Sequence, residues 1–156
     1  MIREWIPNRE LNTTVEIRGD PRGNVEAIEF KGGIRPWSGE YRLGASIEIE
    51  EYLAGERTIF TTGCVEGRID RITGPFRRSA MRKAMEIPYG QTVAYSELAE
   101  SMGSRAWRAV GSAMARNPVA IIVPCHRVVA KHGIGGFGGD VGLKRRLLVL
   151  EGADLP

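Results

Sequence analysis

The stretch IIVPCHRVV, Ile121–Val129, constrains the interpretation of this chain more than any other. Its apolar, strand-like beginning leads into Pro124, which has no backbone N–H to donate and so ends ladder pairing. Cys125 therefore lies where a strand gives way to an irregular turn. His126 and Arg127 follow it, a titratable base and a permanent cation that favour thiolate over thiol. We expect Cys125 to be a nucleophile, although a lone cysteine on an apolar strand is more often a buried structural residue.

Length and composition are those of an ordinary soluble globular protein. The chain has 156 residues, of which 42% are hydrophobic and 26% charged, enough for one substantial core or two small ones. No stretch approaches the ~20 apolar residues of a membrane span, and the start lacks a signal-peptide core. Cys64 and Cys125 are too few for a disulfide framework, so we expect a cytoplasmic protein. No zinc-type ligand spacing occurs, and we expect no metal.

The net charge of +3 conceals an asymmetry between the two halves of the sequence. Residues 1–75 carry 10 basic and 13 acidic side chains, whereas residues 76–156 carry 12 and 6. Arginine provides 18 of the 22 basic residues, and its planar fork binds phosphate bidentately. A coding bias toward arginine would give the same excess, so charge alone leaves nucleic acid as an open alternative.

The first half of the chain has the pattern of a small lobe containing strands. Val15–Arg18 and Val25–Phe30 alternate apolar and polar residues around a turn, which predicts a hairpin of half-buried strands. Residues 46–54 predict a short helix, because acidic residues crowd its start and a glycine ends it. Arg68–Ile72 is strand-like. We therefore predict an α+β protein with a small N-terminal α/β lobe at 1–73 and a mostly helical lobe at 74–156.

Three helices are predicted in the second lobe. Residues 76–85 carry an apolar stripe that repeats every three to four residues, which is typical of a half-buried helix. Residues 95–102 and 105–116 flank Gly103 and form a helix-turn-helix pattern. Small residues and arginines on the last helix would let it approach another surface, and close helix packing explains the small residues equally well. We expect Trp107 to face the core.

The segment Val123–Val129 resembles the active-site signature of the O6-alkylguanine-DNA alkyltransferases, also called methylated-DNA–protein-cysteine methyltransferases. The resemblance extends over Gly74–Gly152. Other segments recur in the family's order and spacing: Ile87–Tyr95, Arg108–Gly111, Asn117–Pro118, Lys144, Leu147–Leu148 and Glu151–Gly152. The resemblance implies an RNase H-like sheet in the N-terminal lobe and a winged-helix-like helix-turn-helix in the C-terminal lobe.

The chemistry that the resemblance implies is irreversible, stoichiometric transfer of an alkyl group from O6-alkylguanine in DNA, and by extension O4-alkylthymine, to Cys125. The resemblance implies no cofactor. His126 would accept the thiol proton through a water, and Glu151 would orient and stabilise its imidazole. Tyr95 would donate toward the guanine ring nitrogen. Asn117 would brace the turn around the active site.

The partner implied by the resemblance is alkylated double-stranded DNA, bound by a monomer. The last predicted helix would lie in the minor groove, with Arg108 entering the stack in place of the extruded nucleotide. The DNA-contacting residues would be Tyr95, Arg108, Ala109, Gly111, Ser112, Ala113 and Arg127. The base and alkyl pocket would be lined by Pro118, Val128, Phe137 and Gly138.

The loop Ile134–Asp140 departs from the family pattern. Phe137 takes the place of the usual tyrosine and can still form an apolar wall. Gly138 has no side chain to donate to the guanine oxygen, so a backbone amide would have to do so. Asp140 puts a carboxylate where glycine is common. The rate of transfer and the tolerance for bulky alkyl groups are the properties this loop would change.

Two other classes of protein remain as alternatives. A non-catalytic module that recognises alkylated DNA would share the helix-turn-helix, but such relatives typically replace the cysteine. A cysteine hydrolase would use the same Cys-His-Glu logic, but it would need an oxyanion hole and would turn over repeatedly. We expect Cys64 to be non-catalytic, since its flank offers no base, and His132 to be a solvated loop residue.

Overall fold

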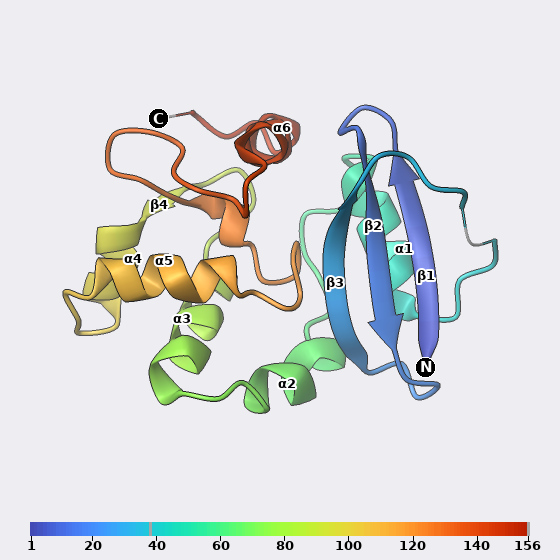
Figure 1. Cartoon of the computed structure of the whole chain (residues 1–156), viewed down its shortest axis with the longest axis horizontal. Coiled ribbons are helices and arrows are strands. Elements are labelled where there is room, and N and C mark those ends of the chain that lie inside the picture. The colour runs from blue at the N-terminus through green and yellow to red at the C-terminus, as the bar shows by residue number, and fades with distance from the viewer. Residues whose placement is uncertain (38, 156) are drawn as a thin grey trace. The chain divides into compact units, whose positions relative to one another are not determined.

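A computed structural model describes residues 1–37 and 39–155 of the chain. It mixes helices with a small antiparallel sheet (Figure 1), as the α+β prediction requires. The chain forms two compact units, Met1–Arg71 with Pro118–Ile122, and Ile72–Asn117 with the residues from Val123 onward. The segment Pro118–Ile122 thus groups with the first unit, whereas the sequence places it within the lobe at 74–156.

The first unit is built on a three-stranded antiparallel sheet in the order β1-β2-β3 (Figure 1). The strands are β1 (Ile2–Asn8), β2 (Thr13–Gly19) and β3 (Val25–Gly32). The predicted hairpin corresponds to β2 and β3, and Ile17 pairs with Ile28 across it. Both isoleucines are fully buried, so the alternating pattern identified the core face of the sheet.

Two elements of this unit differ from the sequence interpretation. The predicted strand at Arg68–Ile72 is wrong, because helix α2 occupies Gly63–Asp70. Val65, Ile69 and Ile72 are all buried, and their spacing of four and then three residues keeps them on one face of a helix, whereas in a strand Ile69 and Ile72 would point to opposite faces. Strand β1 was not predicted, since its Glu4 is buried.

The buried Glu4 carboxylate holds β1 to the start of α1 (Gly44–Leu53), which is the helix predicted at 46–54. Glu4 Oε1 accepts from Arg42 N at 2.5 Å, and Glu4 Oε2 accepts from the Ser46 hydroxyl. A carboxylate beside the amides at a helix start is favourable because the helix dipole is positive there. An acidic residue therefore occupies a position where a strand pattern leads one to expect an apolar side chain.

The second unit contains the four helices α3 (Pro75–Met85), α4 (Tyr95–Ser101), α5 (Trp107–Ala115) and α6 (Val141–Leu150). Helices α4 and α5 form the predicted helix-turn-helix and pack on each other and on α3. Two short parallel strands, β4 (Val93–Ala94) and β5 (Val128–Val129), pair beside them. The segment between α5 and α6 carries the signature that includes Cys125.

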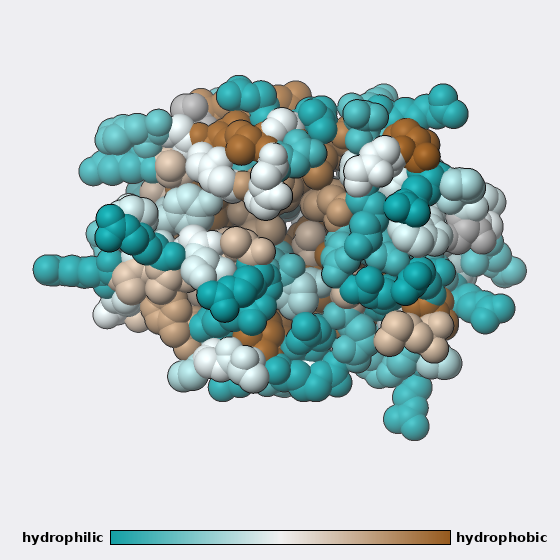
Figure 2. All heavy atoms as spheres, viewed as in Figure 1, coloured by the Kyte–Doolittle hydropathy of each residue, from teal (hydrophilic) through white to brown (hydrophobic). Residues whose placement is uncertain are grey.

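Hydrophilic side chains cover much of the face shown in Figure 2, and apolar residues there form only small separate areas. Within residues 1–37 and 39–155, every helix is too short or too polar to cross a bilayer.

Candidate active site

The turn that presents Cys125 is a short 3-10 helix, η1 (Cys125–Arg127), which begins directly after Pro124. Cys125 N donates to Val123 O at 2.8 Å, and Arg127 N donates to Pro124 O at 2.9 Å. The Asn117 side-chain amide donates to Val123 O at 2.7 Å. The strand expected before Pro124 is wrong, because Ile121 and Ile122 lie in a turn, with Ile121 at φ 72°. The turn that presents Cys125 is closed by these backbone hydrogen bonds and by the amide of Asn117, two residues after α5.

The Cys125 thiol is buried, and burial raises its pKa above the ordinary value. The hydrogen bond from Asn117 and the charge of Lys144 oppose this rise without cancelling it. Sequence reasoning held that His126 and Arg127 would favour the thiolate, and this is wrong for the resting protein. Both side chains bond to Glu151 instead, so desolvation of the sulfur dominates.

Glu151, directly after α6, is the centre of a buried network. Its carboxylate lies 2.6 Å from His126 Nε2 and accepts from Arg127 Nε at 2.8 Å and Nη2 at 3.0 Å. It also accepts from Gly90 N at 3.1 Å. Burial alone would raise the pKa of Glu151, but the hydrogen bonds and charges of His126 and Arg127 lower it to about 2. The structure therefore brings together an ionised Glu151 and the imidazole next to Cys125.

His126 is fully buried. Burial lowers its pKa, while the hydrogen bond and charge of Glu151 act in the opposite direction. A neutral imidazole that donates Nε2–H to the carboxylate carries its lone pair on Nδ1. This is the form that can accept a proton.

Arg127 does not lie where a DNA-contacting residue would. It is buried, and besides Glu151 its guanidinium donates to Ile87 O at 2.7 Å and lies 5.7 Å from the centre of the Tyr89 ring. Reaching a phosphate would break a buried ion pair and leave Glu151 without its cation, which is strongly unfavourable. The expected DNA contact by Arg127 is therefore wrong, and Arg127 is a counter-charge within the site.

Lys144 is the residue of this site to which sequence reasoning gave no role. It is fully buried on α6, and its ammonium donates to Val128 O at 2.6 Å and to Gly136 O at 3.1 Å. Burial lowers its pKa to about 8, and the charge of Cys125 opposes this. One signal could have found it, because Lys144 precedes Leu147 and Leu148 by three and four residues and so lies on the buried stripe of the helix.

Tyr95 begins α4 and stands against the loop that follows β5. Its hydroxyl lies 3.5 Å from both Gly136 O and Lys144 Nζ, and burial raises its pKa. Gly135, at φ +77°, packs on the ring so closely that a Cβ there would come within 2.9 Å of Tyr95 Cε2. The position of Tyr95 therefore depends on a glycine in this loop.

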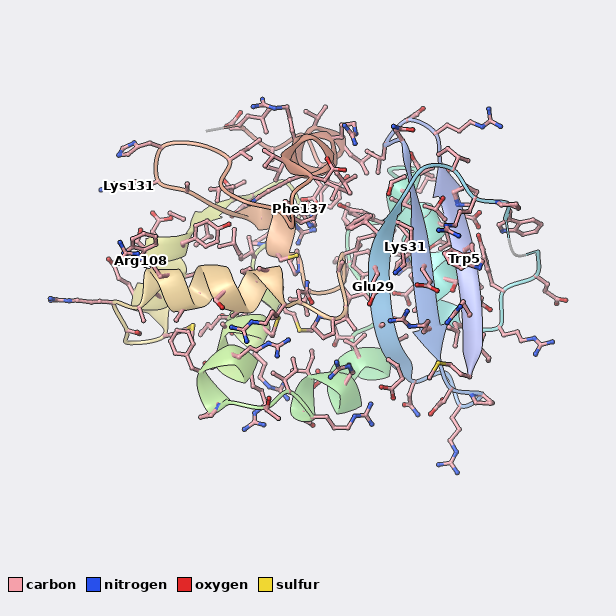
Figure 3. The ribbon with its side chains drawn as sticks, viewed as in Figure 1. Trp5, Glu29, Lys31, Arg108, Lys131 and Phe137 are labelled. Atoms are coloured by element: carbon pink, nitrogen blue, oxygen red, sulfur yellow. The ribbon has the colours of Figure 1, made fainter. Side chains whose placement is uncertain are left out.

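Of the residues expected to line the base and alkyl pocket, three belong to the second unit and one to the first. Val128 is buried in β5, and Phe137 and Gly138 lie in the loop before α6, where Figure 3 labels Phe137. Pro118 belongs to the first unit, where its carbonyl accepts from Ile28 N. Asp140 has a structural role, because its carboxylate accepts from Leu143 N at 2.8 Å and caps α6.

The residues expected to contact DNA along α5 also differ in exposure. Arg108 and Ala109 are exposed and Gly111 and Ser112 are partly exposed, but Ala113 is buried and cannot be a surface contact. Ala113 follows Val110 by three residues and shares its packed face.

Three further residues lie outside this site. The expectation that Trp107 faces the core is wrong, since it is 49% exposed. His132 is exposed in its loop, as predicted. Cys64 is half-buried in α2, and burial and the charge of Glu48 raise its pKa. Within the described ranges, 1–37 and 39–155, no three His, Cys, Asp or Glu side chains are grouped to hold a metal ion.

The sequence model of the family described as 6-O-methylguanine DNA methyltransferase, DNA binding domain, matches residues 75–153. A methylated-DNA–protein-cysteine methyltransferase of Saccharolobus solfataricus is 49% identical over 84 residues, 54% of this chain and 55% of that protein. A protein of the same name from Metallosphaera sedula is 38% identical over 111 residues, 71% of this chain and 68% of that one. The match thus spans about half the length of the Saccharolobus relatives.

Solved structures cover nearly the whole chain. The O6-methylguanine methyltransferase of Mycobacterium tuberculosis superposes with a TM-score of 0.76 at 30% identity, covering 99% of this chain and 96% of that one. A structure of the M. tuberculosis protein OGT in complex with DNA gives 0.76 at 32% identity, covering 95% and 91%.

Proposed function

Since this chain belongs to the 6-O-methylguanine DNA methyltransferase family, we propose that it repairs DNA directly, by moving the alkyl group of an O6-alkylguanine onto Cys125. The observation that carries this proposal is the burial of Cys125, His126 and Glu151, with His126 in contact with Glu151, inside the segment that matches the family. Asn117 and Lys144 act on the sulfur from the other elements of the same unit.

The first chemical step is formation of the thiolate. Cys125 gives its proton to His126 through a water, and Glu151, which is ionised, stabilises the imidazolium that results. The resting thiol has a raised pKa, so the proton leaves only when a base is placed to receive it. The ammonium of Lys144 favours the anion that forms.

In the transfer itself, the Cys125 sulfur attacks the alkyl carbon. A carbon–sulfur bond forms while the bond from that carbon to guanine O6 breaks, and the electron pair of the broken bond goes to the base. Tyr95 donates its proton toward the guanine ring nitrogen, so the base leaves neutral, and the proton that His126 took from Cys125 balances the one that Tyr95 gives. Regenerating the Cys125 thiol would need a nucleophile that displaces a thioether, so each protein molecule reacts once. The transfer uses no cofactor. O4-alkylthymine is a second substrate of the same type.

Helix α5 lies in the minor groove of the DNA. Ala109 and Gly111 let the helix backbone come close to the duplex, and Arg108 takes the place of the extruded nucleotide. The family relation and the DNA complex of the M. tuberculosis protein support this partner.

We also propose that the α4–α5 pair is of the winged-helix type and that the sheet of the first unit is RNase H-like. The protein would act as a monomer in a reducing compartment such as the cytoplasm, where Cys64 and Cys125 stay unoxidised.

The proposal is tested by intact-protein mass after mixing with a slight excess of an O6-methylguanine duplex. One methyl-sized gain is expected for the wild type and for Cys64→Ser, and none for Cys125→Ala. No gain on the wild type, with the lesion still bound, would overturn the transfer and favour a non-catalytic recognition module. Repeated turnover without a mass gain would favour the hydrolase.

A further inference from the structure

Trp107, at the first position of α5, is a large apolar side chain left 49% exposed. Val110 and Met114, three and seven residues on, share its helix face and are buried. The packed stripe of α5 therefore stops one turn short of Trp107. An indole at this degree of exposure forgoes much of the free energy that burial would supply. Its conformation has to be explained by something other than the core.

The Arg108 guanidinium lies over the Trp107 ring, 4.7 Å from its centroid. Figure 3 shows Arg108 at the end of α5 where the helix begins. Indole and guanidinium are both planar groups that stack on aromatic faces. The side chain proposed to replace the extruded nucleotide is thus already paired with a flat aromatic ring in the free protein.

Trp107 also lies on the side of α5 that faces the active site. Gly111, four residues on, is placed so that a Cβ there would be 3.9 Å from the Tyr95 ring. Residues four apart lie on one helix face, about 6 Å apart along the axis. The indole therefore stands about one helical turn from the point where α5 packs on Tyr95, the ring proposed to meet the flipped base.

The surroundings of Trp107 are basic. Arg105 and Arg108 are exposed, and no acidic residue occupies the first turn of α5. This combination of cations and an exposed ring suits a polyanion that also presents aromatic faces. Duplex DNA with one base extruded is such a partner, because the neighbours of the missing base lose a stacking contact.

We propose that Trp107 and Arg108 form a two-residue wedge, in which the Trp107 indole stacks on a base next to the extruded nucleotide while Arg108 fills the gap. This inference rests on the proposed function, since it assumes that the substrate is a duplex with a flipped base. It adds a stacking residue and a reason for the exposed tryptophan. Stacking of this kind is lost on alanine substitution with a weakening of roughly 5- to 150-fold.

The first test is fluorescence of a full-length protein in which Trp5 and Trp37 are replaced by phenylalanine. Trp107 is then the sole reporter, because the chain has three tryptophans. A nucleobase stacked on an indole quenches its emission. We expect strong quenching by an O6-methylguanine duplex and weaker quenching by the undamaged duplex of the same sequence. Equal or absent quenching by the two duplexes would overturn the wedge.

The second test compares Trp107→Ala with Trp107→Phe and with a matched control, Trp37→Ala, which removes an indole that is 56% exposed in the first unit. We expect Trp107→Ala to bind the lesion duplex about 10-fold more weakly, Trp107→Phe to recover most of the loss, and Trp37→Ala to bind like the wild type. The loss on the duplex should exceed any loss on free O6-benzylguanine at least about 5-fold.

The outcomes separate this inference from the proposed function. Methyl transfer by the wild type with duplex binding unaltered by Trp107→Ala would overturn the wedge alone. Quenching of Trp107 by the lesion duplex without methyl gain on Cys125 would support the wedge and overturn the transfer. Thermal unfolding of Trp107→Ala close to that of the wild type would show that the loss is one of binding. If that variant is unfolded, Trp107→Phe and the quenching decide.

Discussion

Replacing Glu151 by glutamine tests the buried network most directly. The side chain keeps its shape but loses the charge that His126 and Arg127 surround, at 2.6 Å and 2.8 Å. The new amide would direct N–H groups at two donors, and the Arg127 guanidinium would stay buried without a counter-charge. Breaking one side of a buried ion pair costs about 3–5 kcal/mol. The melting temperature should fall by roughly 6–20 °C for a chain of this size.

The assay is urea unfolding of the wild type, Glu151→Gln and a control, Glu86→Gln. Glu86 pairs with Lys83 at 2.9 Å on the surface of the same unit, and exposed pairs of this kind contribute about 0–1 kcal/mol. We expect the control to unfold like the wild type. A loss below about 1 kcal/mol for Glu151→Gln would refute the reasoning, since the buried network would then carry no more than a surface pair.

The pH dependence of the same unfolding curves has a fixed sign. Because the folded pKa of Glu151 is about 2 against an ordinary 4.5, its contribution to stability is present above the ordinary value and is lost as the pH falls through the folded one. The wild type should therefore lose stability between about pH 4.5 and pH 2 more steeply than Glu151→Gln does.

Three further outcomes are expected. Lys144→Met removes the charge that favours the Cys125 thiolate, so reaction with free O6-benzylguanine should slow about 10-fold near neutral pH and recover partly in alkali; an unchanged rate would contradict this role. The pKa of Lys144 is about 8 in the folded protein against an ordinary 10.5. Between these two pH values only the unfolded chain keeps the proton, so the free energy of unfolding of the wild type should rise with pH there, and that of Lys144→Met should lack this rise. Gly135→Ala should displace Tyr95 and slow transfer about 10-fold, while Gly67→Ala, with open space around it, should react normally.

Helices α3, α4 and α5 of the second unit could be anticipated from the sequence, and so, through the family resemblance, could the pairing of His126 with Glu151, whereas α6 was not predicted. Apolar spacing marks one face of a helix wherever that face is buried, as in α3. The Cys-His-Arg signature and a glutamate 25 residues after the histidine carry the family resemblance, and that resemblance implies that His126 and Glu151 pair. These features depend on local pattern or on a motif with a fixed spacing.

Other features depend on contacts between distant segments, which no local pattern contains. From the sequence, Arg127 looks like a surface cation, but in the structure it is buried because it pairs with Glu151, 24 residues away. Lys144 is buried because carbonyls of Val128 and Gly136 receive its ammonium. Glu4 disrupts the alternation of β1 because its partners lie at the start of α1. In each case a polar side chain is satisfied by tertiary structure.

The burial of Cys125 has a consequence for how long its thiol stays unmodified. A thiol that stays protonated and away from solvent reacts slowly with dissolved oxidants and small electrophiles. Cys64, half-buried outside the site, also has a raised pKa. Under the proposed function each molecule reacts once, so it must keep its sulfur inert toward everything except the alkyl group that it accepts. Burial of Cys125 therefore protects the thiol from side reactions and limits the groups that can react with it.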